Sequence, residues 1–212
     1  MNIQSILDPI MIAGFVILIF SIVIHEVSHG SMANQLGDET AKSQGRLSLN
    51  PIKHIDLIGT IVLPLMLIFV GSPMVIGWAK PVPVNFNNLI DKKWGEFKVA
   101  LAGPLSNLLV AVTCGLLIRL LELPQTLIAV LSLAVIYNIL LALFNLIPVP
   151  PLDGSHILFS FLRDNYKLKA TLSQYGFLIL IFILFFTPVL DYIFYLSIFL
   201  SNLITGGRLI LL

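Results

Sequence analysis

Five long apolar stretches restrict the fold of this chain more than any other feature. One begins at Ile10, and the others lie at about residues 57–72, 99–118, 127–147 and 176–205. A helix needs about 20 apolar residues to cross the hydrocarbon core of a bilayer. Hydrophobic residues make up 58% of the chain and charged residues 11%, against roughly 45–50% and 25% in soluble domains. The sequence therefore predicts an all-α polytopic membrane protein, a helix bundle of about five to six membrane segments.

Two of these stretches are ambiguous. The stretch at 57–72 is short, contains Pro64 and ends in Gly71-Ser72-Pro73, which favours a short re-entrant helix over a full span. The last stretch contains Pro188 and Asp191, so it is either one tilted helix or two shorter ones.

The length and charge of the chain limit its organisation and its partners. Its 212 residues predict a single membrane-embedded domain over 1–212, with a core at about 10–160 and C-terminal membrane helices at about 173–206. The net charge is +1, and the Lys and Arg residues are scattered through loops. The sequence therefore predicts the lipid bilayer as a partner and no nucleic acid.

The first apolar stretch contains the motif His25-Glu26-Val27-Ser28-His29. On a helix, positions i and i+4 share a face, so His25 and His29 can bind one metal ion while Glu26 reaches a water molecule beside it. His25 lies 15 residues beyond Ile10, or roughly 22 Å along a helix, within a hydrocarbon core about 30 Å thick. Ionisable residues at that depth are unfavourable unless they are paired, so the motif predicts a metal site.

A catalytic zinc site usually has three protein ligands, and the third must come from elsewhere in the chain. The best candidate is Asp153, which follows a proline-rich break after the fourth apolar stretch. The alternative is that Asp153 only caps the helix that starts at Gly154. We expect the remaining histidines, His54 and His156, to be structural hydrogen-bonding residues.

Several motifs of this chain resemble the site-2 protease family, the intramembrane zinc metalloproteases, in its compact bacterial and archaeal branch. Together they cover residues 20–160 in the family's order. They are His25–His29, Leu49–Asp56, Gly77–Asn85, Ala102–Asn107 and Asn145–Gly154.

The resemblance implies one zinc ion per chain, held by His25, His29 and Asp153, with Glu26 as the general base. It also implies a zinc metalloendopeptidase whose substrates are transmembrane segments of other proteins. The active site would lie nearer the cytosolic face of a prokaryotic cell membrane. No PDZ or CBS module is visible in the sequence.

Two amides and one proline-rich segment are further candidates for binding substrate. Asn107 and Asn145 lie at membrane depth, where they could contact the substrate backbone or the developing oxyanion, or simply join helices by hydrogen bonds. Residues 80–86 suit an extended, β-like segment that pairs with an unwound substrate, with Val82 and Val84 donating N–H groups. An ordinary surface loop is the alternative.

The distribution of basic residues predicts the orientation. If residues 57–85 enter the membrane and return, ten of the twelve basic residues fall on one side, which the positive-inside rule makes cytosolic, with the N-terminus outside. If 57–72 spans the membrane, this bias weakens. The ten are Lys42, Arg46, Lys53, Lys80, Lys92, Lys93, Lys98, Arg163, Lys167 and Lys169.

A membrane zinc transporter or zinc-binding scaffold could also place histidine and carboxylate side chains in a bilayer. Glu26 distinguishes these classes, because a protease needs a carboxylate beside the first histidine that does not bind the metal, whereas a transporter does not.

Overall fold

The computed structural model describes residues 9–70, 77–162 and 165–210. Within these ranges the regular elements are all helical and no β-strand is assigned. The helices are α2 (Pro9–Gln35), α3 (Thr40–Ser43), η1 (Pro51–His54), η2 (Leu57–Val62), α4 (Leu63–Phe69), η3 (Phe86–Asn88), α5 (Gly95–Leu120), α6 (Gln125–Asn145), α7 (Asp153–Phe161), α8 (Tyr166–Phe186) and α9 (Val189–Thr205). Among the described residues, α2, α5, α6 and α8 are long and apolar enough to cross a membrane. The prediction of a polytopic helical membrane protein is confirmed.

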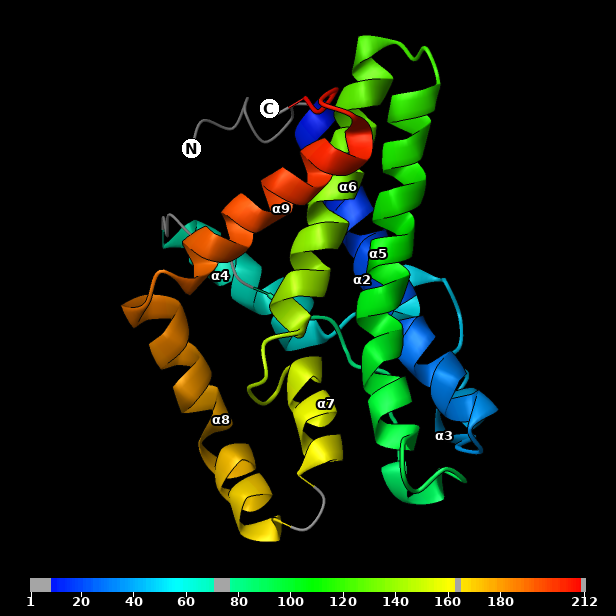
Figure 1. The fold of residues 1–212 in the computed structure, drawn as a ribbon, viewed down its shortest axis with the longest axis vertical. Coiled ribbons are helices and arrows are strands. Elements are labelled where there is room, and N and C mark those ends of the chain that lie inside the picture. Colours follow the sequence, from blue (N-terminus) through cyan, green and yellow to red (C-terminus); the bar gives the residue numbers. More distant parts are fainter. Residues whose placement is uncertain (1–8, 71–76, 163–164, 211–212) are drawn as a thin grey trace.

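The bundle is centred on α2, α5 and α6, which pack against one another (Figure 1). Small buried residues lie at the helix contacts: Ala111 of α5 packs with Val135 and Ile139 of α6, and Gly115 of α5 faces Ile204 of α9. Between apolar helices in lipid, small side chains allow the backbones to approach closely, so van der Waals packing holds the bundle together. The helix α9 packs across α5 and α6, where Leu200 and Ile204 contact their buried core.

The two ends of the bundle are defined by hydrogen bonds between helix termini. At one end, Ile90 N donates to Leu36 O (2.8 Å), which joins the end of α2 to the segment that leads into α5. At the other end, Arg119 Nη1 of α5 donates to Leu203 O of α9 (3.4 Å). The end of α7 and the beginning of α8 lie at the first end (Figure 1). Basic residues at this end include Lys92 and Lys93, which precede α5, and Lys167 and Lys169 in the first turn of α8.

The last apolar stretch forms two helices. α8 ends at Phe186 and α9 begins at Val189, with Thr187 and Pro188 between them. Proline has no N–H to continue the helical hydrogen bonds, and it restricts the residue before it to extended conformations. In Figure 1, α8 and α9 therefore run at an angle to each other along the side of the bundle.

The stretch at 57–72 has the geometry of a re-entrant element. It forms the six-residue π-helical turn η2 and the seven-residue α4, which together reach only about 20 Å. After it the chain returns to its starting point, since Lys80 N donates to His54 O (2.9 Å) and Trp78 N donates to Gly59 O (3.1 Å). Residues 71–73, part of the predicted break, lie outside the described residues.

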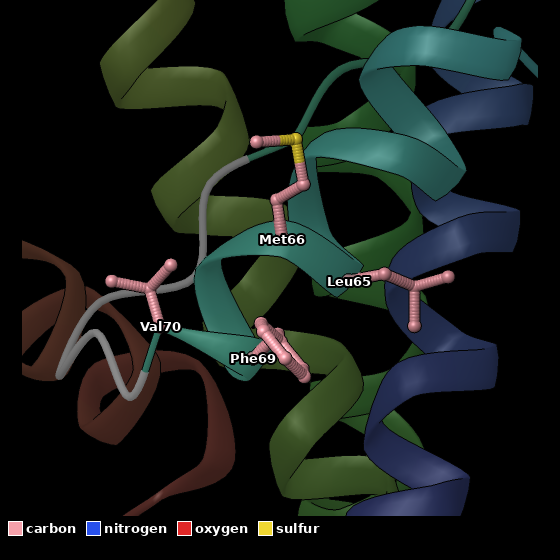
Figure 2. Close-up of a pocket in the computed structure, with 4 residues that line it drawn as sticks. All are labelled: Leu65, Met66, Phe69 and Val70. Carbon is pink, nitrogen blue, oxygen red and sulfur yellow. The ribbon is translucent and has the colours of Figure 1, made fainter.

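An apolar hollow on α4 is lined by Leu65, Met66, Phe69 and Val70 (Figure 2). These side chains are between 59% and 93% exposed. A continuous apolar surface of this kind is unfavourable in water and is expected where lipid is the solvent. Its described lining residues are all apolar, and none of them belongs to the candidate metal site.

Candidate metal centre

The helix α2 presents His25 and His29 on one buried face, and α7 presents Asp153 as its first residue. His25 Nε2 lies 3.0 Å from His29 Nε2. Asp153 Oδ2 lies 3.0 Å from His25 Nε2 and 3.3 Å from His29 Nε2. The structure thus brings together the three residues that the sequence motifs singled out. Among the described residues they are the one group of this composition that could hold a metal ion.

The far side of each imidazole ring faces a hydrogen-bond acceptor. His29 Nδ1 lies 2.7 Å from Val99 O, a backbone carbonyl that can only accept. His25 Nδ1 lies 2.5 Å from Asn107 Oδ1. Both Nδ1 atoms must therefore carry the proton, which leaves each neutral imidazole with a lone pair on Nε2.

Two nitrogen lone pairs and a carboxylate oxygen therefore face one another at the centre of the site. Asp153 Oδ2 is buried and receives no hydrogen bond in the described structure, although it lies beside both Nε2 atoms. Three acceptors with no proton among them repel one another unless a cation lies between them. Ligands of a tetrahedral zinc ion are roughly 3.3 Å apart, close to the three separations here. The residues fit a zinc ion in both chemistry and spacing.

The capping alternative for Asp153 has no support in the local geometry. α7 begins at Asp153, its N-cap residue is Leu152, and no side chain makes a capping hydrogen bond there. Gly154 lets this turn approach the end of α6, because a Cβ at Gly154 would lie 2.3 Å from Leu146 O and 2.4 Å from Ile147 O. This close backbone contact places Asp153 at the metal site.

Gly103 of α5 lies directly against the two imidazole rings. A Cβ at this position would be 2.3 Å from His29 Nε2 and 2.6 Å from His25 Cε1. Gly103 belongs to the motif Ala102–Asn107, which resembles the site-2 proteases. Its contact with the two rings depends on the packing of α5 against α2.

Asn107 contacts His25 on the Nδ1 side of its ring, away from the Nε2 atom that faces His29 and Asp153. It is fully buried, and its Nδ2 donates to Ser21 O (3.2 Å) and to Asn138 Oδ1 (2.8 Å). Asn138 is oriented in turn by its donation to Ala134 O (2.8 Å). The network fixes Asn107 Oδ1 towards His25, so in this structure Asn107 orients a candidate ligand through a hydrogen bond between helices. Asn138 was not among the predicted site residues, although an amide in an apolar stretch was a signal.

Replacing Asn107 with alanine should weaken zinc binding by about 10- to 100-fold, the usual effect of losing a hydrogen-bond partner of a ligand. Asn107→Asp keeps an acceptor for His25 Nδ1 and should retain more affinity than Asn107→Ala. Competition with a chelator in detergent measures both. Equal zinc affinity in wild type and Asn107→Ala would contradict this role.

The other predicted site residues have different surroundings. Asn145 Nδ2 donates to Leu141 O in its own helix (3.0 Å). Val82 N donates to Glu26 Oε2 (2.7 Å), so its N–H is not on an open edge in this structure. Val84 is half-buried against the cluster formed by Ala33, Leu89 and Val99.

The two remaining histidines make hydrogen bonds outside the candidate metal group. His156 Nδ1 lies 2.9 Å from Glu96 Oε1, which links α7 to α5. His54 is buried, and its Nε2 lies 2.8 Å from Ser48 O.

This chain is similar to a peptidase family and to several proteins named as zinc metalloproteases. Residues 121–187 match the model of peptidase family M50. The chain is 38% identical over 186 residues to YwhC of Bacillus subtilis, whose name gives zinc metalloprotease as a proposed activity; the match covers 83% of this chain and 81% of that protein. It is 30% identical to Rip2 of Mycolicibacterium smegmatis, similarly named, with 86% and 68% covered.

A more distant relative is the zinc metalloprotease MJ0392 of Methanocaldococcus jannaschii, 25% identical over 74% of this chain and 37% of that protein. No solved structure matches the chain significantly. Because the similarity to YwhC extends over most of both proteins, this chain belongs to peptidase family M50, the site-2 proteases, and is a zinc metalloprotease.

Proposed function

We propose that this protein is an intramembrane metalloendopeptidase that hydrolyses a peptide bond within or next to a transmembrane segment of other membrane proteins. The observation that carries the proposal is the convergence of His25, His29 and Asp153 on one point, with Glu26 adjacent, inside a bundle of membrane-length helices. His25, His29 and Asp153 would hold zinc. When bound, zinc supplies a Lewis acid that activates water and polarises the scissile carbonyl.

The protein's own residues would perform the proton transfers. Glu26 is half-buried one residue beyond His25, and its Oε2 is held by the Val82 N–H. The Glu26 carboxylate, through Oε1, would accept a proton from the attacking water and deliver it to the leaving amine nitrogen. Asn107 and Val99 O hold the imidazole rings in the tautomer that turns Nε2 towards the site.

We further propose that residues 1–212 act as one domain in a prokaryotic cell membrane. Leu180 of α8 packs on Val149 and Leu152, beside Asp153, so the C-terminal helices are packed on the core. A chain that enters after His54 and returns at Lys80, as the Lys80 N to His54 O hydrogen bond supports, would keep the basic residues before and after it at one end of the bundle. The positive-inside rule makes that end cytosolic, with the N-terminus outside and the active site nearer the cytosolic face.

The experiment is a cleavage assay with protein purified in detergent and a panel of single-span membrane protein fragments. Glu26→Gln should retain zinc and lose activity by at least about 100-fold, because general acid–base catalysis contributes about 10²- to 10⁴-fold. Glu122→Gln, an exposed residue in the α5–α6 connection, is the matched control. Mass spectrometry of the products should locate the cut in or beside the apolar segment.

Two results would contradict the proposal. Cuts confined to loops far from the apolar segment would exclude the proposed substrate class. Full biological activity in Glu26→Gln, together with its loss in His25→Ala, would favour zinc transport or a scaffold function.

A further inference from the structure

Glu26 is hydrogen-bonded to a segment far away in the sequence. Val82 N donates to Glu26 Oε2 at 2.7 Å, and the Val82 side chain is 7% exposed. Val82 lies between Pro81 and Pro83, which have no N–H, so it is the one residue of this triplet that can donate to a carboxylate. The position of Glu26 therefore depends on how residues 80–85, called here the 80–85 segment, are held.

Arg46 holds the first end of this segment. Its guanidinium is buried, and Nη2 donates to Lys80 O (2.9 Å) and to Pro81 O (3.3 Å). Within the described structure it forms no ion pair with a carboxylate. A buried cation is unfavourable unless its donors are paired. The carbonyls of Lys80 and Pro81 accept from Nη2, while Nε has no hydrogen-bond partner in the described structure.

Asp38 holds the second end. It is fully buried and accepts hydrogen bonds from Asn85 N (2.7 Å), Asn88 Nδ2 (2.9 Å) and Thr40 Oγ1 (2.5 Å). Burial alone would raise the pKa of the Asp38 carboxyl, but these hydrogen bonds outweigh it and hold the pKa below its ordinary value. Asp38 therefore stays ionised at neutral pH and anchors the segment with a full charge.

Close packing against α2 completes the arrangement. A Cβ at Gly30 would lie 2.6 Å from Val82 Cγ1 and 2.7 Å from Leu47 Cδ2. Gly30 therefore lets Val82 lie directly on the helix that contains Glu26. The segment is fixed at its two ends by charged groups and in its middle by packing and by the bond to Glu26.

We propose that Arg46 and Asp38 are positioning residues for Glu26, which act by holding the 80–85 segment so that the Val82 N–H fixes one carboxylate oxygen of the base. The inference rests on the proposed role of Glu26 as general base. A glutamate side chain has three rotatable bonds, and its carboxylate must lie within hydrogen-bond reach of the attacking water. Fixing Oε2 to a rigid backbone donor removes that freedom before substrate arrives.

The direct test removes the Val82 N–H without removing the segment. Val82 precedes a proline, so its backbone is already restricted to the extended region that proline also adopts. Val82→Pro deletes the donor, whereas the control Val82→Ala keeps it and shortens the side chain. The substrate is the panel fragment that wild type cleaves fastest, and zinc content is measured for every variant.

We expect Val82→Pro to lower kcat by about 10- to 100-fold, the scale of a misplaced catalytic group. KM should stay within about twofold and zinc content should stay at the wild-type level, since neither depends on the orientation of the base. Val82→Ala keeps the N–H but loses part of the packing on Gly30, so it should lower kcat less than Val82→Pro does. A kcat for Val82→Pro equal to or above that of Val82→Ala would overturn the proposal.

Arg46→Met tests independently whether Arg46 holds the 80–85 segment. It decides whether that segment positions Glu26 if Val82→Pro fails to fold or to bind zinc. Arg46→Met should lower kcat with zinc retained, and an unchanged kcat would refute the role of Arg46. Combined with a folded Val82→Pro, it should add little further loss, because both changes act through one hydrogen bond. If wild type and Glu26→Gln cleave equally, the proposed function fails, whereas an inactive Glu26→Gln beside a fully active Val82→Pro overturns only this inference.

Discussion

Asp153→Asn should abolish zinc binding under conditions in which wild type retains the metal. Asparagine preserves the shape of the side chain but removes the charge and a strong oxygen ligand. Zinc sites bind with about 10–16 kcal/mol shared among their ligands, so losing one should cost about 3 kcal/mol, more than 100-fold in affinity. Zinc content after purification and competition with a chelator give the measurement.

The same variant should have the opposite effect on the zinc-free protein. Asp153 Oδ2 is buried beside two lone pairs and has no hydrogen-bond donor in the described structure. Without metal, the neutral amide relieves that repulsion, so Asp153→Asn should unfold at the same temperature as chelator-treated wild type or higher. Addition of zinc should raise the Tm of wild type only.

Asp191→Asn is the matched control, because Asp191 is an exposed carboxylate in the first turn of α9. It should bind zinc as wild type does. Wild-type zinc affinity in Asp153→Asn would show that the metal is held elsewhere, and the assignment of the site would be wrong.

Gly103→Ala should be nearly as damaging, although it adds a single methyl group. The new Cβ would lie 2.3 Å from His29 Nε2 and 2.6 Å from His25 Cε1, far inside van der Waals contact. Gly103 is in the interior of a 26-residue helix, so its backbone cannot retreat without moving α5 away from α2. The imidazole rings must move instead, and we expect loss of zinc together with about 1–3 kcal/mol of destabilisation from overpacking.

Gly14→Ala provides the comparison for this prediction. Gly14 is also a helical glycine facing a neighbouring helix, but its nearest contact for a Cβ is the Tyr137 hydroxyl at 3.2 Å. That side chain can shift slightly, so zinc content and Tm should remain close to wild type. Normal zinc content in Gly103→Ala would contradict the proposed fit between α5 and the two rings.

The sequence predicted the parts of the site that depend on one helix. His25 and His29 are one helical turn apart, so their common face follows from helix geometry alone. Asp153 was a candidate because an acidic residue at membrane depth needs a partner, and the capping alternative stayed open until α7 was placed. Pro188 also indicated a break in the last apolar stretch, but the sequence left open whether this stretch forms one helix or two.

The hydrogen-bond partners of two candidate residues came only from the structure. Asn107 was a candidate either for contact with substrate or for hydrogen bonds between helices, and here it lies 2.5 Å from His25 Nδ1. The Val82 N–H was a candidate for pairing with an unwound substrate, with an ordinary surface loop as the alternative, and here it donates to Glu26. Both partners lie dozens of residues away, and apolar periodicity says nothing about which polar groups of separate helices meet.

By itself the sequence determined that this chain is a helical membrane protein with two histidines and a glutamate on one turn, because helix length, apolar content and i,i+4 spacing are local properties. Only the tertiary structure decided which tautomer the imidazoles adopt, why position 103 is glycine and what holds Glu26. Each of these depends on contacts between α2 and segments that are distant in the sequence. Those contacts form only when the helices of the bundle pack together.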